Sequence, residues 1–70
     1  MKREPVTSSV IAAIGYDRQF RWLEVELKSG GVYLYREVPP RVHQAFMAAL
    51  SKGSFYSRYI RDDYPSARLT

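Results

Sequence analysis

The stretch FRWLEVELKSGGVYLYREV, residues 20–38, decides the fold because it encodes two strands joined by a tight turn. Apolar and acidic side chains alternate over residues 22–27, which is typical of a half-buried strand. Glycines 30–31 tolerate positive φ, so we expect a hairpin there and a returning strand over residues 32–38. This hairpin predicts an antiparallel sheet.

The register of the hairpin decides where its tyrosines point. With a two-residue loop, Leu27 faces Val32, and Tyr33 and Tyr35 share the outer face with the glutamates. With a type I turn and a glycine bulge, Leu27 faces Gly31 instead, and both tyrosines turn to the core. We favour the second register because it buries two large rings in a core that is short of volume.

The residues before the hairpin predict one further strand. Residues 8–17 are rich in apolar side chains and lack a helical polar face. Strict alternation would place Val10, Ala12, Ile14 and Tyr16 on one side of this strand and Ile11, Ala13 and Gly15 on the other. The polar first residues and residues 65–70 read as loose ends.

Two helices are expected after the hairpin. Pro39 and Pro40 end the strand and suit a first helical turn. Apolar residues then recur at helical spacing, at Val42, Ala45, Phe46, Ala49 and Leu50. Gly53 reads as a stop and Ser54 as the N-cap of a short helix over residues 55–61. In that helix Phe55, Tyr56, Tyr59 and Ile60 share one side, with Arg58 and Arg61 opposite.

The sequence therefore predicts an α+β fold: a three-stranded antiparallel β-meander followed by two helices packed on one face. With 70 residues the chain forms a single domain, residues 1–70, whose core spans about residues 6–64 between flexible ends. Because the chain has no cysteine, disulfides and thiolate metal sites are excluded. We expect no cofactor and no metal.

The charge favours an anionic partner. The formal net charge is +4, from 11 basic and 7 acidic residues. A basic domain of this kind suits nucleic acid or an acidic protein surface. No apolar run approaches the length of a membrane helix, and no secretory signal is recognisable, so we expect a cytoplasmic protein without a membrane partner.

The order of motifs resembles the KTSC domain, a family named for its occurrence at the C-terminus of some lysyl-tRNA synthetases and also found as small bacterial proteins. The resemblance covers about residues 6–64. The segments that carry it are Ser8-Ser9, Ile14-Gly15-Tyr16-Asp17, Leu23-Glu24-Val25-Glu26-Leu27, Tyr33-Leu34-Tyr35, Val38-Pro39, Ala49, Ser51-Lys52-Gly53 and Ile60-Arg61. Leu27 and Trp22 depart from the family pattern, in packing more than in chemistry. The association with a tRNA synthetase implies RNA as the partner.

The residues for nucleic-acid binding are expected on the helices. Basic side chains for phosphates and rings for stacking are Lys52, Arg58, Arg61, Arg41, Tyr56 and Tyr59. Such binding to RNA or another nucleic acid should depend strongly on salt and hardly on base sequence. The competing interpretation is an ordinary solvated helix face, partly neutralised by Asp62 and Asp63.

The alternative function is a protein–protein interaction module. Trp22 and Leu34 would form a small apolar patch on the sheet, beside its exposed edge. This patch would hold a protein partner or a second copy in weak self-association. An enzyme is not expected, because His43 is the single histidine and Glu24 with Glu26 reads as a solvated strand face without a cleft.

Overall fold

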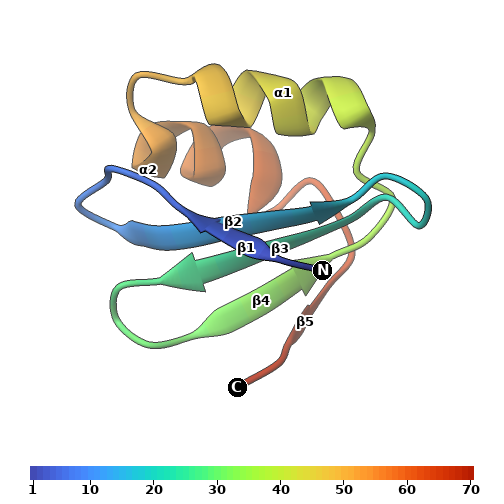
Figure 1. The fold of residues 1–70 in the computed structure, drawn as a ribbon, viewed down its shortest axis with the longest axis horizontal. Coiled ribbons are helices and arrows are strands. Elements are labelled where there is room, and N and C mark those ends of the chain that lie inside the picture. The colour runs from blue at the N-terminus through green and yellow to red at the C-terminus, as the bar shows by residue number, and fades with distance from the viewer.

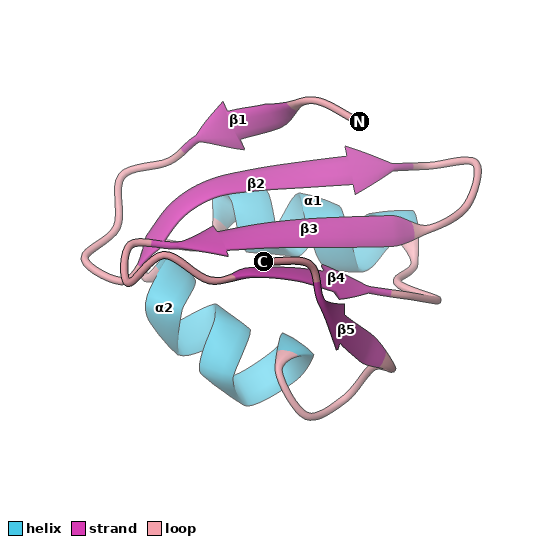
Figure 2. Ribbon diagram, turned by 90° about the horizontal axis from the view of Figure 1, so that it is seen from below, coloured by secondary structure: helices cyan, strands magenta, loops and turns pink.

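The computed structural model describes all 70 residues and consists of one antiparallel sheet with helices on one face (Figure 1). The strands, paired in chain order, are β1 (Arg3–Pro5), β2 (Ile11–Asp17), β3 (Trp22–Leu27), β4 (Val32–Tyr35) and β5 (Ser66–Arg68). The helical segments are α1 (Pro40–Ala48), α2 (Lys52–Phe55) and the π-helix η1 (Tyr56–Ile60). Seen from below, the other face of the sheet carries no helix (Figure 2).

The sheet is wider than predicted, with five strands rather than three. The two chain ends that we expected to be loose form its edge strands: β1 pairs with β2, and β5 pairs with β4. Both edge strands have three residues, and Pro5 removes one backbone donor from the outer edge of β1. The interaction-module alternative assumed that the edges of the three-stranded meander were exposed. In the structure these edges, β2 and β4, are paired with β1 and β5.

The first strand is held by an arginine that crosses a glycine. Arg3 lies opposite Gly15, and Gly15 lies opposite Glu24. The Arg3 guanidinium reaches over the strand to pair with Glu24 at 3.5 Å and with Glu26 at 3.8 Å. A Cβ on residue 15 would lie 3.0 Å from the Arg3 Cγ, so glycine makes room for this crossing.

The favoured hairpin register is confirmed. The Leu27 amide donates to the Gly31 carbonyl at 2.8 Å, and Gly30 has a φ of 111°. Tyr33 lies opposite Val25, and Tyr35 opposite Leu23. Both rings therefore face the helices. Tyr35 is fully buried in the core, and Tyr33 packs against that core.

The strict alternation of side chains that we predicted for residues 10–16 is wrong. The pairing of β2 with β3 shifts between Ile11 and Ala13, which marks a β-bulge. The extra residue brings Ile11 to the same face as Ile14, and both are buried in the core. Val10 lies before the strand and is exposed.

The end of the first helix and the start of the second both differ from the prediction. The first helix ends at Ala48, so Leu50 lies beyond it and is fully exposed instead of facing the core. The N-cap of the second helix is Ser51 rather than Ser54, since the Ser51 Oγ accepts from the Ser54 amide at 3.2 Å. Gly53 lies inside that helix against Val10, where an added Cβ would be 3.2 Å from a Val10 methyl carbon.

The core lies between the sheet and the helices. Its buried side chains are Ile11, Ile14, Leu23, Val25, Tyr35, Val38, Phe46, Tyr56 and Ile60. The Tyr35 and Tyr56 rings meet edge to face at 5.9 Å, and their hydroxyls share a hydrogen bond. Burial and this hydrogen bond raise the pKa of Tyr35. None of the helices has the length and apolar character needed to cross a bilayer.

Candidate nucleic-acid interface

A groove of about 350 Å³ runs between α1 and η1. One wall is formed by α1 and contains Arg41, and the other contains Tyr59 from η1. The complete lining is Arg41, Val42, Ala45, Phe55, Tyr59, Asp63 and Tyr64. The groove thus combines an apolar aromatic surface with one basic and one acidic side chain.

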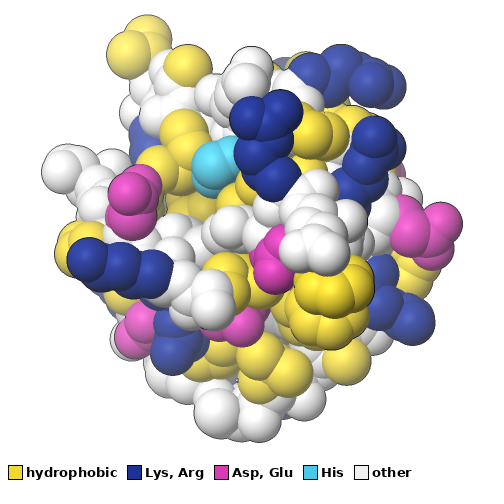
Figure 3. Space-filling view, turned by 45° about the vertical axis from the view of Figure 1, so that its right-hand side comes forward, with side chains coloured by type: hydrophobic (Ala, Val, Ile, Leu, Met, Phe, Trp, Pro, Cys, Tyr) yellow, Lys and Arg dark blue, Asp and Glu magenta, His cyan; other side chains and the backbone are white.

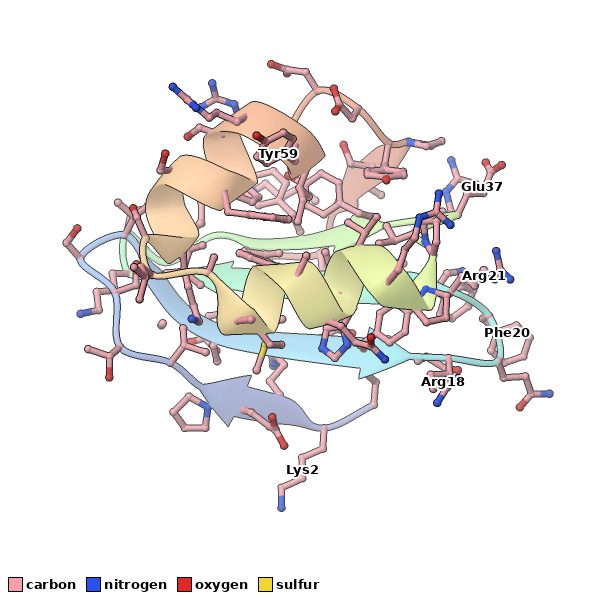
Figure 4. All side chains as sticks on the ribbon, turned by 90° about the horizontal axis from the view of Figure 1, so that it is seen from above. Lys2, Arg18, Phe20, Arg21, Glu37 and Tyr59 are labelled. Carbon is pink, nitrogen blue, oxygen red and sulfur yellow. The ribbon has the colours of Figure 1, made fainter.

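A row of aromatic contacts runs from the core to the groove and supports Tyr59. The Phe46 ring, which is fully buried, stacks on Phe55 at 5.3 Å between centroids. Phe55 contacts Tyr59 in turn at 4.9 Å, with the two planes tilted by 52°. Tyr59 is 51% exposed, so the row ends in a ring that is supported on one side and open to solvent on the other. Figure 4 shows Tyr59 on the helical side of the molecule.

One of the predicted basic residues lies beside this ring. Arg41 lines the groove, whereas Arg58 precedes Tyr59 in η1 but is not part of the lining; both are exposed. The ion pairs of the structure involve only the basic residues Arg3 and Arg61, so the guanidinium groups of Arg41 and Arg58 have no carboxylate partner.

The other predicted site residues are not brought to the groove. The Lys52 ammonium donates to the Ala49 carbonyl at 2.8 Å and thereby helps end α1. Arg61 lines a separate hollow of about 380 Å³ and lies 4.0 Å from Asp62. Tyr56 is buried in the core and bonded to Tyr35, so its ring offers no stacking surface.

The structure gathers further arginines that the helix-based prediction missed. Because β2, β3 and β4 are antiparallel, the β2–β3 turn and the β4–α1 link lie at the same end of the sheet. The Val38 amide donates to the Arg21 carbonyl at 3.0 Å and ties the two segments together. We call this end the arginine end; its exposed arginines are Arg18, Arg21, Arg36 and Arg41.

The pictures show the same gathering. In Figure 3 this end of the molecule is turned towards the viewer, and Lys and Arg side chains lie there among hydrophobic ones and a few Asp or Glu side chains. Figure 4 places Arg18, Phe20 and Arg21 together in the β2–β3 turn, with Glu37 in the nearby β4–α1 link. Arg41 belongs to both the groove and the arginine end, since it lies in the first turn of α1. The signal in the sequence is the pair of arginines within one turn, at positions 18 and 21.

The open face of the sheet has little capacity for RNA. Tyr33 and Tyr35 face the helices, so no tyrosine platform lies on this face. Glu24 and Glu26 lie there instead, and they are paired with Arg3. Carboxylates at these positions oppose the approach of phosphate, so the sheet is a weaker candidate for nucleic-acid binding than the helices.

Trp22 contacts Phe20 rather than forming the predicted patch with Leu34. Its ring stacks on Phe20 at 5.0 Å, and the two side chains are 37% and 56% exposed. Leu34 lies opposite Glu24 on one side and Ala67 on the other, and it is half-buried. The apolar patch at this end is therefore the Phe20–Trp22 pair, and Phe20 is the residue that the sequence interpretation overlooked.

The single histidine joins α1 to the sheet. The His43 ring stacks on Tyr16 at 4.4 Å with an angle of 9° between the planes. The Tyr16 hydroxyl donates to the Val38 carbonyl. Burial lowers the pKa of His43, although the charge of Glu4 partly opposes this effect. Burial also raises the pKa of Tyr16.

This stack predicts a pH dependence of stability. Because the pKa of His43 is lower in the folded than in the unfolded state, the unfolded chain binds the proton more readily. The contribution of neutral His43 to the free energy of unfolding is complete above the pKa of the unfolded state, about 6.5. It is lost as the pH falls through the lower pKa of the folded state. Urea unfolding at pH 7.5 and 5.5, conditions chosen on either side of about 6.5, should show lower stability at the acidic value. His43→Phe keeps a stacking ring and should abolish this difference; an unchanged difference would assign it to other groups.

Two sequence motifs meet in a hydroxyl-lined pocket on the other side of α2. Ser8 and Ser9 from the β1–β2 link face Ser51 and Lys52 across it. The Ser8 Oγ accepts from the Val10 and Ile11 amides at 3.1 and 3.2 Å. Together with the Ser51 cap, this assigns the Ser8 and Ser51 hydroxyls to local backbone bonding.

The comparisons with known proteins agree with this architecture. A family model described as the KTSC domain matches residues 7–64. The crystal structure of a KTSC domain protein from Yersinia pestis superimposes with a TM-score of 0.96 at 42% identity, covering 99% of this chain and 97% of that one. Its coverage takes in the edge strands, which lie outside the family match.

Relatives are found both as small proteins and within a larger one. An uncharacterised protein from Stutzerimonas stutzeri is 39% identical over 64 residues, which cover 91% of this chain and 90% of the relative. A lysine–tRNA ligase from Nostoc punctiforme is 34% identical over 62 residues, covering 89% of this chain but 11% of that protein. The chain belongs to the KTSC domain family.

Proposed function

We propose that this domain binds single-stranded RNA without chemically changing it, with a base in the α1–η1 groove and the backbone across the arginine end. The observation that carries the proposal is the position of Arg41, which lies in the groove with Tyr59 and also at the arginine end. A nucleotide on the ring of Tyr59 therefore has a guanidinium beside it. Cytoplasmic RNA is the partner that this proposal implies.

The groove supports the stacking part of the proposal. Its volume of about 350 Å³ is within the usual range of small-ligand sites. The Tyr59 ring is already ordered by Phe55 and Phe46, so little conformational entropy is lost when a base stacks on it. Stacking of a base on an aromatic side chain contributes about 1–3 kcal/mol in single-strand binding proteins.

The charges support the backbone part. The arginines of the arginine end have no carboxylate partners, so they remain available to phosphates. The first turn of α1 carries no acidic residue, and its helix dipole adds positive potential at the same end. The formal net charge of +4 draws an anionic chain to the domain from a distance.

A binding role rather than catalysis fits the side chains of the groove. Asp63 is the carboxylate in the lining, and no histidine, serine or cysteine accompanies it, so the groove does not contain the usual pair of an activated hydroxyl or thiol and an imidazole base. The lysine–tRNA ligase relative adds support by analogy, since its name connects a protein that contains a similar domain with tRNA.

The proposal is tested by fluorescence anisotropy with a labelled single-stranded RNA. If Arg18, Arg21 and Arg36 each contact a phosphate, log K should fall with log salt at a slope of about −2. Affinity should then drop about 20-fold between 50 and 200 mM salt, by the same relation. Lys28→Ala, at the opposite end of β3, removes one positive charge away from the site and should leave the slope unchanged. Absence of binding at the lower salt concentration would refute the proposal.

A protein partner is the second candidate function, and the exposed Phe20–Trp22 pair favours it. Two large stacked rings at a turn tip form a compact apolar contact surface. Binding through them would hold or strengthen as salt rises, in contrast to phosphate binding. Trp22→Ala would then weaken binding of the protein partner and leave RNA binding intact.

A further inference from the structure

We infer that the base held in the α1–η1 groove is guanine, read by Asp63 and Arg41 from opposite walls. This inference rests on the proposed RNA binding and goes further by naming the base. Arg41 belongs to α1, and Asp63 follows η1, so the two charged side chains reach the groove from the two elements that form it. Between them the lining is apolar and aromatic, which leaves these two groups to select the edge of a stacked base.

A carboxylate distinguishes the bases by their Watson–Crick edges. Guanine presents two adjacent donors there, N1–H and the N2 amino group, which match the two oxygens of an ionised carboxylate. Adenine and cytosine each place a ring-nitrogen acceptor beside their single amino group, and uracil flanks its single N–H with two carbonyl oxygens. An acceptor facing a carboxylate is repelled, so Asp63 favours guanine.

The arginine favours the same base from the other side. The remaining edge of guanine carries the O6 and N7 acceptors, and a guanidinium donates to both at once. Guanine is therefore the base that presents paired donors to Asp63 and paired acceptors to Arg41. The ring of Tyr59 or Tyr64 supplies the stacking that is common to all bases.

Asp63 is also held in place by the backbone. Its amide donates to the Ile60 carbonyl at 3.1 Å, which continues the end of η1 into the turn that contains Asp63. Asp62, the preceding residue, is not part of the groove lining and lies 4.0 Å from Arg61 instead. The chain thus offers two neighbouring aspartates, one inside the groove and one outside it.

The test uses labelled uridine pentamers that carry a single central G, A, C or U, since one guanine cannot form a quadruplex. The intact domain should bind the G pentamer about 10-fold more tightly than the others at low salt, as expected for a bidentate base contact. Asp63→Asn should remove this preference, because the amide offers one acceptor oxygen and one amino donor in place of two acceptor oxygens. Asp62→Asn makes the same change in charge and should keep it.

Each result separates the inference from the proposed function. Equal binding of the four pentamers by the intact domain would overturn guanine reading but leave RNA binding standing. A guanine preference that survives Asp63→Asn, or disappears in Asp62→Asn, would show that Asp63 is not the reader. If none of the pentamers binds, RNA binding and guanine reading are both wrong.

Discussion

Replacing Phe46 with alanine should lower the free energy of unfolding by about 4 kcal/mol, the largest effect expected from a single substitution in this chain. Phe46 is the buried residue of α1, with 0% of its surface exposed, and it stacks on Phe55. Its truncation loses the buried ring and leaves a cavity between the helix and the sheet. A domain of this size has only about 4–10 kcal/mol of stability to lose.

The measurement is urea unfolding followed by circular dichroism, with Leu50→Ala as the matched control. Leu50 follows α1 and is fully exposed, so its truncation should change stability by less than about 0.5 kcal/mol. A loss below about 1 kcal/mol for Phe46→Ala, where the usual range for buried Phe is about 3–5, would show that α1 does not depend on this ring.

The second large effect concerns binding. The double variant Arg41→Ala, Tyr59→Ala should bind single-stranded RNA about 100-fold more weakly than the intact domain. The ring accounts for about 30-fold of this loss through stacking, and the guanidinium for the remainder through its phosphate or base contact. Because both side chains are exposed, the unfolding midpoint of the double variant should stay close to that of the intact domain.

Two controls assign the loss to the groove. Tyr59→Phe retains the stacked ring and should bind nearly as well as the intact domain. Lys28→Ala lowers the net charge by the same amount as Arg41→Ala but lies in the β3–β4 turn, so it should weaken binding only slightly. If Lys28→Ala weakens binding as much as Arg41→Ala does, RNA is held by overall charge and the groove has no special part.

The central hairpin was predictable because its determinants are local. Gly30 adopts the positive φ that the bulged turn requires, and the alternation over residues 22–27 places Leu23 and Val25 inside. The edge strands were not predictable in the same way. Strands of three residues carry no period, and β1 is held by Arg3 crossing Gly15 to Glu24, which joins residues distant in the sequence.

The candidate site was predicted only in part, for two physical reasons. The prediction assumed ordinary helical spacing, but residues 56–60 form a π-helix, in which the Arg61 amide bonds to the Tyr56 carbonyl. Tyr56 and Tyr59 were predicted to share one side of an α-helix, but in this wider turn Tyr56 is buried in the core and Tyr59 is exposed in the groove. The arginine end, moreover, is assembled by the sheet topology from separate segments.

The most direct test of the central claim is an NMR titration of the ¹⁵N-labelled domain with a single-stranded RNA at low salt. The claim predicts amide shifts at Arg41, Tyr59 and Tyr64 and along the β4–α1 link, fading as salt is added. Shifts confined to the β3–β4 turn at Lys28, or no shifts at all, would contradict it.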